Sequence, residues 1–200
     1  MLFWIVYILI WLPVKILFPT RIIGRKNLQK GKGLYACNHQ CWADIPILAI
    51  AVNRRVYALA KKELCNTKLK NWFFTGIGCI PIDRKEADIS SIKAVINVLK
   101  HKNKPILIFP QGHRMSSPDE LENIKNGVSM FSIKTQSPIY PIVIIKKPRL
   151  FVPNKLIIGK HLDLAKYEGR KADKELYSEI SQDLTIAMQE LLDNNTKKSK

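Results

Sequence analysis

Apolar and polar positions divide the chain into an apolar first segment and a body in which short apolar runs alternate with amphipathic stretches. From residue 1 to residue 18 the only charged side chain is Lys15, and Pro13 interrupts the run. In the body, short apolar runs predict strands, and apolar residues three or four positions apart predict helices. The predicted strands are 34–37, 56–60, 80–82, 105–109, 139–145 and 155–158. The predicted helices are 45–52, 62–74, 87–100 and 173–192.

The alternation of strands and helices predicts an α/β domain with a mixed, largely parallel sheet flanked by helices. The clearest helical stretch of the middle places Ile89, Ile92, Ile96 and Leu99 on one face. In such sheets ligands bind beyond the carboxyl ends of strands, so the loops after strands are where functional residues are expected. We expect an anchor at 1–19, a catalytic domain at 20–193 and a polar tail at 194–200.

The first eighteen residues predict a membrane-anchoring helical segment. A helix of this length would measure roughly 27 Å, slightly less than a ~30 Å hydrocarbon core, so it would barely span or lie as a kinked, half-inserted hairpin. Basic residues follow it at Arg21, Arg25 and Lys26, which predicts a body facing the cytoplasm at the inner membrane. The alternatives are a buried core helix and a secretory signal, although no basic residue precedes the run and no small-x-small cleavage site follows it.

Charge is strongly unbalanced, with 33 Lys and Arg against 16 Asp and Glu, a net charge of +17. Such a surface attracts nucleic acid, anionic membranes or phosphorylated substrates. The apolar first segment favours a membrane, and the aromatic and basic interleaving of an RNA-binding strand is absent, so we expect no nucleic-acid partner. The four cysteines form no C-x-x-C pair, which is typical of reduced thiols in a cytosol-facing protein.

The segment N-H-Q-C-W-A-D, residues 38–44, lies where the first predicted strand of the body gives way to a helix. An Asp five positions after His39 can fold back to one imidazole nitrogen and leave the other free to take a proton. A substrate hydroxyl would then be the nucleophile, with no serine or cysteine needed. A zinc site at Cys37, His39 and Cys41 is the alternative, but a structural zinc needs a fourth ligand and the other cysteines lack ligand spacing.

Two further loops end in arginine. Residues 76–84, G-I-G-C-I-P-I-D-R, place glycines where the backbone can approach a ligand, then a short strand and Arg84. Residues 109–114, F-P-Q-G-H-R, follow a buried strand and end at Arg114, which suits a phosphate loop. Lys125 precedes Asn126 and Gly127, where a helix with anion-binding amides is expected to start.

In order and spacing these segments resemble the 1-acylglycerol-3-phosphate acyltransferases, whose motifs are N-H-x-x-x-x-D, G-x-x-x-x-x-R, F-P-E-G-x-R and a short strand around V-P-V or P-I-x-P. The fourth corresponds to P-I-Y-P-I-V at 138–143, and the resemblance covers roughly residues 20–165. It implies direct transfer of a fatty acyl group from acyl-CoA or acyl carrier protein to the sn-2 hydroxyl of 1-acylglycerol-3-phosphate, giving phosphatidic acid in phospholipid synthesis. It implies no covalent acyl-enzyme, cofactor or metal, and a lysophospholipid and the bilayer as partners.

By motif match, His39 and Asp44 are the expected catalytic dyad. The expected substrate-binding residues are Asn38, Arg84, Gln111, Gly112, Arg114 and Lys125, with Arg84 as the main phosphate ligand. The third motif departs from the family, because Gln111 and His113 stand where Glu and Thr are usual. This departure leaves open another lysolipid, an amino-acid lipid or glycerol-3-phosphate as acceptor, and the fold alone would also suit a non-catalytic basic membrane protein.

The basic stretch of the body holds six cations and one acid, Glu63, and is expected to bind anionic head groups or coenzyme A phosphates, unless it is a solvated basic face. The six are Arg54, Arg55, Lys61, Lys62, Lys68 and Lys70.

Overall fold

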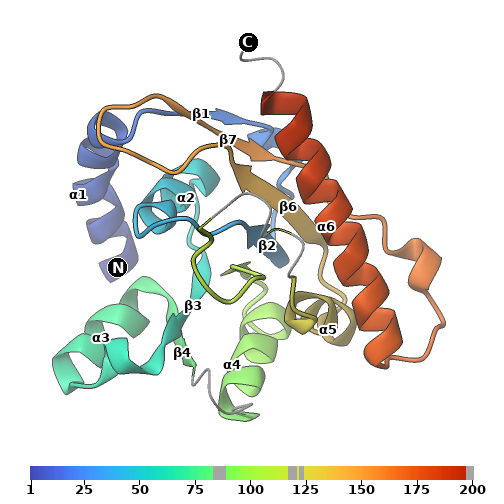
Figure 1. Cartoon of the computed structure of the whole chain (residues 1–200). Coiled ribbons are helices and arrows are strands. Elements are labelled where there is room, and N and C mark those ends of the chain that lie inside the picture. Colours follow the sequence, from blue (N-terminus) through green and yellow to red (C-terminus); the bar gives the residue numbers. More distant parts are fainter. Residues whose placement is uncertain (83–88, 117–120, 122–123, 197–200) are drawn as a thin grey trace.

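A twisted sheet runs through the molecule and helices lie on both of its faces (Figure 1). The computed structural model describes residues 1–82, 89–116, 121 and 124–196. The strands are β1 (Thr20–Ile23), β2 (Gly33–Cys37), β3 (Tyr57–Lys61), β4 (Cys79–Ile82), β5 (Pro105–Ile108), β6 (Ile139–Ile144) and β7 (Asn154–Ile158). The α-helices are α1 (Leu2–Leu17), α2 (Asp44–Val52), α3 (Lys68–Ile77), α4 (Ile89–Lys100), α5 (Gly127–Thr135) and α6 (Lys174–Thr196).

The strands of the described residues follow the order β1-β7-β6-β2-β5-β3-β4. Every neighbouring pair is parallel except β6 and β7, which are antiparallel. The predicted mixed, largely parallel sheet flanked by helices is therefore confirmed. The edge strand β1 was not predicted, because four residues directly after a long apolar run carry no distinct period, and pairing with β7 alone defines it.

The inner strands bury both faces, as a parallel sheet covered on both sides requires. Along β2, Leu34 and Ala36 point into the core beneath α4, α5 and α6, whereas Tyr35 and Cys37 point into the core beneath α2. This alternation follows from the two-residue period of a strand. A one-residue shift in register would exchange the two cores, so the pattern of β2 specifies its pairing with β5 and β6.

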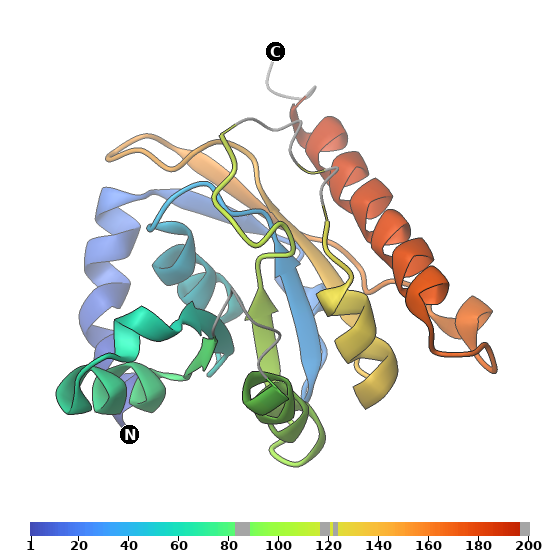
Figure 2. The same ribbon diagram turned by 60° about the horizontal axis from the view of Figure 1, so that its bottom comes forward.

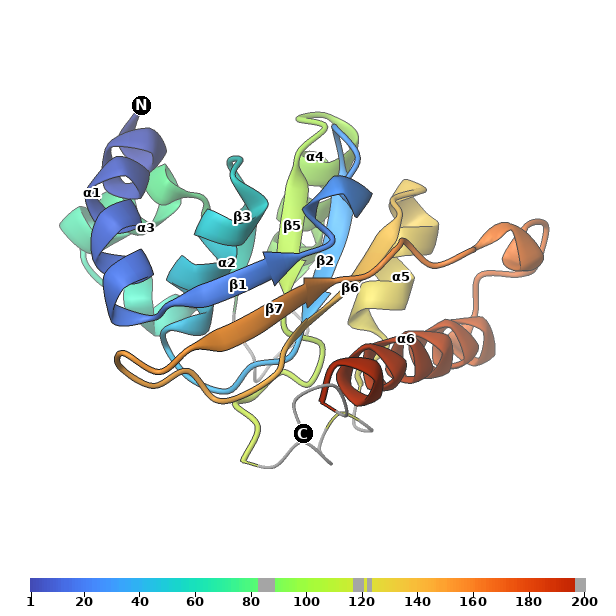
Figure 3. The same ribbon diagram turned by 90° about the horizontal axis from the view of Figure 1, so that it is seen from above.

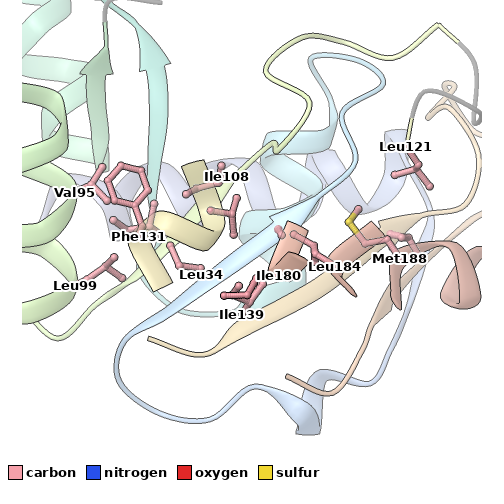
Figure 4. Packing of buried hydrophobic residues seen from close by; sticks show 14 of the residues in the cluster. Leu34, Val95, Leu99, Ile108, Leu121, Phe131, Ile139, Ile180, Leu184 and Met188 are labelled. Atoms are coloured by element: carbon pink, nitrogen blue, oxygen red, sulfur yellow. The ribbon is translucent and has the colours of Figure 1, made fainter. Parts of the chain in front are cut away.

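Amphipathic helices close the first face (Figure 4). Val95 and Leu99 of α4 and Phe131 of α5 pack with the sheet, and the same core continues along α6. The apolar residues of α6 in this core are Leu176, Ile180, Leu184, Met188 and Leu192. Their three- and four-residue spacing places them on one side of the helix, as the sequence predicted.

The second face is covered by α2, and α1 and α3 lie farther out on the same side (Figure 2). The helix α1 buries Phe3 and Tyr7 and exposes most of its other large side chains. Tyr7 donates a hydrogen bond to Asn53 Oδ1 at 2.8 Å, which fixes α1 to the end of α2. The first segment is thus one continuous helix through Pro13, neither a hairpin nor a core helix. None of the helices in the described part of the chain is both long and apolar enough to cross a bilayer.

The predicted helix 62–74 is two elements, a 3-10 turn at Lys62–Cys65 and then α3. Thr67 separates them because its hydroxyl caps α3, accepting from the backbone of Lys70 at 3.3 Å. The glycines that follow have roles within the fold, and their approach to a ligand stays a prediction. Gly76 lies in α3, where a Cβ would come within 2.6 Å of the Leu2 side chain, and Gly78 ends α3 with a positive φ of 105°.

Candidate active site

The predicted catalytic residues lie in two loops at one edge of the sheet. One loop runs from β2 to α2, and the other leaves β5. Because β2 and β5 are adjacent and parallel, their carboxyl ends meet at this edge. A backbone hydrogen bond from the Met115 N–H to the His39 carbonyl, at 2.6 Å, joins the two loops directly.

His39 and Asp44 form the predicted pair. Nδ1 of His39 lies 2.8 Å from Oδ2 of Asp44. The carboxylate is fully buried and the imidazole is 12% exposed, so one edge of the ring reaches solvent. A carboxylate can only accept, which places the proton on Nδ1 and the lone pair on Nε2. Hydrogen bonds within the described part of the chain leave Nε2 without a partner, and it is available to a substrate hydroxyl.

Backbone groups hold the carboxylate in place before any substrate binds. Oδ2 of Asp44 also accepts from the N–H of Gln40 at 2.5 Å and of Cys41 at 2.8 Å. These bonds fix the orientation of the carboxylate, and they exist because the loop folds back over the first turn of α2. Phe109 stacks on the imidazole with ring centroids 4.0 Å apart and planes 17° apart. Phe109 was not among the predicted site residues, although it opens the F-P-Q-G-H-R segment.

The neighbouring cysteines do not build the alternative zinc site. Cys37 points into the core and its Sγ lies 3.6 Å from Asn38 Oδ1, whereas the Sγ of Cys41 lies 3.7 Å from Asp44 Oδ1. Across residues 1–82, 89–116, 121 and 124–196, no three His, Cys, Asp or Glu side chains gather as metal ligands. Burial and the Asp44 carboxylate raise the pKa of Cys41, so its thiol is a poor nucleophile at neutral pH.

The side chain of Asn38 bonds to the backbone of β6 and holds the start of the loop in place. It is almost fully buried, its Nδ2 donates to the Ile144 carbonyl at 3.0 Å and its Oδ1 accepts from the Ile144 N–H at 2.8 Å. This pair continues the β2–β6 pairing by one step beyond β2 and sets the direction in which the loop departs. Substrate binding by Asn38 stays a prediction, because both of its polar atoms are occupied here.

The loop after β5 brings together the predicted residues of the third motif. Gly112 adopts a positive φ of 78°, and Nζ of Lys125 lies close above it, 3.1 Å from where a Cβ would stand. The Lys125 N–H donates to the Pro110 carbonyl at 3.0 Å, which holds the start of α5 against this loop. Gln111 is fully buried, and among the residues that the structure describes neither its Oε1 nor its Nε2 has a hydrogen-bond partner. An unpaired buried amide is costly, typically about 1–3 kcal/mol, so Gln111 is a candidate for contact with a polar ligand.

A cavity of about 550 Å³ opens between the two loops. Arg114 and Lys147 bring positive charge to it, and Trp42 contributes an exposed indole. The other lining residues are Phe18, Gln40, Cys41, Ala43, Met115, Ser116 and Pro148. Lys147 was not predicted, because it lies beyond the fourth motif and only the sheet brings it here. Arg84 lies outside the described residues, so its role as main phosphate ligand stays a prediction.

The basic stretch between α2 and α3 divides into two groups. The Arg54 guanidinium donates to the carbonyls of Leu28 and Gln29, and that of Arg55 donates to Gly76. These arginines therefore hold loops together. The remaining cations are exposed and suit a solvated or head-group-binding face, and they are Lys61, Lys62, Lys68 and Lys70.

An apolar cavity of about 140 Å³ lies beneath α1, between it and α2 and the sheet. Ile45 and Pro46 line it and directly follow Asp44 in the chain, so its rim lies within one turn of the dyad. From α1 it is lined by Phe3, Val6, Tyr7 and Ile10. Its walls offer almost no polar group, which suits a hydrocarbon chain.

Comparison with known proteins agrees with this geometry. A model of the family described as acyltransferase matches residues 19–145. The chain is 29% identical over 183 residues to the 1-acyl-sn-glycerol-3-phosphate acyltransferase of Bacillus subtilis, covering 86% of this chain and 87% of that protein. It is 31% identical over 105 residues to the protein of the same name from Streptococcus pneumoniae, covering 52% of this chain and 38% of that one.

Among solved structures, the chain is similar to the 1-acyl-sn-glycerophosphate (LPA) acyltransferase PlsC from Thermotoga maritima. The match has a TM-score of 0.62 at 24% identity and covers 86% of this chain and 71% of the other. At that identity the likeness supports the α/β fold.

Proposed function

Since the chain belongs to the acyltransferase family, we propose that it transfers a fatty acyl group from acyl-CoA or acyl carrier protein to the sn-2 hydroxyl of 1-acylglycerol-3-phosphate. The observation that carries this proposal is the His39–Asp44 pair, in which Nδ1 is bound to a buried carboxylate. The two residues that follow His39, Gln40 and Cys41, line the cationic cavity. Relatives named for this activity support the choice of acceptor.

The proposed reaction needs no covalent enzyme intermediate. Nε2 of His39 takes the proton of the acceptor hydroxyl as its oxygen attacks the thioester carbonyl carbon. The carbon–sulfur bond then breaks, and the leaving thiolate takes the proton back from His39. Asp44 remains a carboxylate throughout and stabilises the imidazolium between the two steps. General base catalysis of this kind contributes about 10²–10⁴ in rate. The acid–base groups all come from the chain, so no cofactor is proposed.

Cationic groups at the cavity would hold the acceptor phosphate. Arg114 lines it and follows Gly112, whose αL turn brings Lys125 alongside. A guanidinium meets two phosphate oxygens at once, so Arg114 would also set the orientation of the acceptor. Placing the hydroxyl at Nε2 in this way lowers the barrier by several kcal/mol. The apolar cavity beneath α1 is the candidate site for the hydrocarbon chain of a substrate.

We also propose that α1 binds the membrane from the cytoplasmic side. Seven large apolar side chains of this helix are exposed, and Arg21, Arg25 and Lys26 follow it. Arg25 takes part in the fold, because its guanidinium donates to the carbonyls of Ala51 and Ile50 at the end of α2. The exposed residues of α1 are Trp4, Ile5, Ile8, Leu9, Trp11, Leu12 and Ile16.

A different acceptor is the second candidate, and Gln111 is the observation that favours it. A neutral amide repels an anionic head group less than the usual glutamate would, and its unpaired atoms can both donate and accept. Another lysophospholipid or an amino-acid lipid would therefore be compatible with this loop.

The test is a matrix of acceptors and donors with the purified, detergent-solubilised chain. Labelled acyl-CoA and acyl carrier protein are each offered 1-acylglycerol-3-phosphate, glycerol-3-phosphate, other lysophospholipids and a lysolipid with an amino-acid head group. The expected result is the highest kcat/KM for 1-acylglycerol-3-phosphate. A preference for another lysolipid would change the proposed acceptor and leave the proposed acyl-transfer mechanism in place. Absence of any acyl transfer above the His39→Ala background would overturn the proposal.

A further inference from the structure

The loop between β6 and β7 ends in an exposed apolar tip. Leu150, Phe151 and Val152 are 56%, 65% and 46% exposed, three consecutive large side chains in contact with solvent. An isolated apolar residue on a surface needs no explanation, but a run of three at a loop tip does. We call residues 150–152 the apolar tip.

The backbone of the apolar tip is strained where its aromatic residue stands. Phe151 has a φ of 61°, in the left-handed region that glycine and asparagine adopt readily. A bulky side chain there is unfavourable by about 1–2 kcal/mol. Since asparagine would relieve that strain and also suit a solvated turn, folding alone does not account for phenylalanine at this position.

Hydrogen bonds fix the tip to the end of α1. The Phe151 N–H donates to the carbonyl of Leu17, the last residue of α1, at 2.7 Å. At the base of the loop, the Asn154 side chain accepts from the Lys146 N–H at 3.1 Å and donates to the Lys146 carbonyl at 2.6 Å. Figure 3 shows the loop extending beside the carboxyl end of α1. The tip is therefore held in a set position relative to the exposed side chains of that helix.

Positive charge flanks the tip. Lys146, Lys147 and Arg149 precede it, all three are exposed, and no acid occurs between residues 145 and 162. Apolar and aromatic side chains next to exposed cations match the interface of an anionic bilayer, with hydrocarbon below and phosphates above.

The same loop borders the candidate active site. Lys147 and Pro148 line the 550 Å³ cavity together with Arg114 and the exposed Trp42. Trp42 packs edge-on against Phe18, which directly follows α1, with ring centroids 5.5 Å apart. The cavity is thus bordered by Trp42 and by the loop that carries the apolar tip.

From these observations we propose that the apolar tip inserts into the surface of an anionic lipid bilayer as a second contact beside α1. The two contacts, α1 and the apolar tip, are joined by the hydrogen bond from Phe151 to Leu17. Together they would fix the orientation of the domain on the membrane, whereas α1 alone would leave the domain free to turn about the helix axis. In this orientation the cavity faces the membrane, so a lysolipid can reach Arg114 and His39 without leaving the bilayer. This proposal rests on the proposed function in two respects, the membrane contact of α1 and the delivery of a lysolipid to His39, whereas the insertion of the tip itself does not.

The first experiment measures binding of the full chain to vesicles in the absence of substrates. Vesicles of phosphatidylcholine mixed with phosphatidylglycerol are floated with wild type, with Phe151→Asn and with Leu150→Ser/Phe151→Asn/Val152→Ser. The triple variant should bind roughly tenfold more weakly, and Phe151→Asn by a smaller factor in the same direction. Ile186→Ser is the matched control, because Ile186 is 57% exposed and belongs to α6, a helix on the opposite side of the molecule from α1 (Figure 1). It should bind as wild type does.

The Phe151→Asn variant distinguishes an effect on folding from an effect on membrane binding. Asparagine suits the left-handed backbone, so its unfolding midpoint should be unchanged or higher while vesicle binding falls. A Phe151→Trp variant adds a fluorescence signal to that of Trp4 and Trp11 of α1, and lipids with brominated chains should quench the added part. Normal vesicle binding by the triple variant overturns the proposal. So does a concentration-dependent dimer that the triple variant abolishes with vesicle binding unchanged, which would assign the tip to self-association.

Activity distinguishes failure of this proposal from failure of the proposed function. The triple variant should keep wild-type turnover on a short-chain acceptor dissolved as monomers and lose turnover on the same head group embedded in vesicles. Loss of vesicle binding with no acyl transfer by wild type would refute the function and keep the membrane contact. Normal transfer from vesicles by the triple variant would refute the membrane contact and keep the function.

Discussion

The helices that cover the two faces of the sheet differ in how much apolar surface they expose. The helices α4, α5 and α6 close one face, and they expose two large apolar side chains, Ile89 and Ile186. On the other face α1 and α3 expose nine, the seven of α1 together with Leu69 and Trp72. Both faces have a buried core of the same kind next to the sheet.

This difference in exposed apolar surface distinguishes helices that stabilise the core from a helix that can bind another surface. On the first face α4 and α6 each bury one stripe and turn the other side to water, whereas α5 is buried on most of its surface. On the second face α2 completes the core, and α1 adds a second layer whose outer surface is mostly apolar, with Lys15 as its one exposed charge. We infer that α4–α6 serve the folding of the domain and that α1 serves its location. The dyad belongs to neither group of helices and lies at the edge of the sheet, at the junction of β2 and α2.

The largest effect on activity is expected at the catalytic dyad, which lies at the edge of the sheet and on neither face. His39→Ala should lower kcat by about 10²–10⁴, because the acceptor hydroxyl loses its base. The unfolding midpoint should change little, since the imidazole contributes one hydrogen bond and a stack on Phe109. Steady-state kinetics beside a denaturation curve measure both. Wild-type kcat in this variant would refute the base assignment.

The core of the first face should control stability. Leu184→Ala removes a fully buried side chain of α6 and should lower the free energy of unfolding by about 2–5 kcal/mol. Vesicle binding by the folded protein should not change. Urea denaturation gives the stability, and Ile186→Ala on the exposed side of the same helix is the control, expected to cost less than about 0.5 kcal/mol. Equal losses for the two variants would contradict the placement of α6.

The outer side of α1 should control binding. Ile8→Ser and Leu9→Ser remove side chains that are 70% and 68% exposed. Each should weaken binding to anionic vesicles severalfold and leave the free energy of unfolding within about 0.5 kcal/mol of wild type. Flotation at low and high salt provides the measurement, because the apolar contribution persists in salt and the electrostatic one is screened. A fall in stability without a fall in binding would make α1 a part of the core like α6.

Much of the candidate site was predictable because its bonds are local. His39 and Asp44 are five residues apart across one strand-to-helix junction, and the backbone amides that hold Asp44 belong to the residues between them. The period of the apolar residues also predicted which side of α6 is buried. Such features depend on neighbours along the chain, so sequence spacing alone determines them.

Other features depend on which distant strands become neighbours, and the periodicity of a strand carries no information on its partner. Phe109 reaches His39 only because β5 lies beside β2, and Phe151 reaches Leu17 only because β7 pairs with β1. The sequence by itself determined the α/β fold, the dyad and the apolar character of the first segment. Only the tertiary structure decided that Gly76 packs against Leu2, that Arg54 and Arg55 bind backbone carbonyls, and that the apolar tip lies beside α1. The physical reason is that each of these contacts joins parts of the chain that local patterns describe separately, and the pairing order of the strands brings them together.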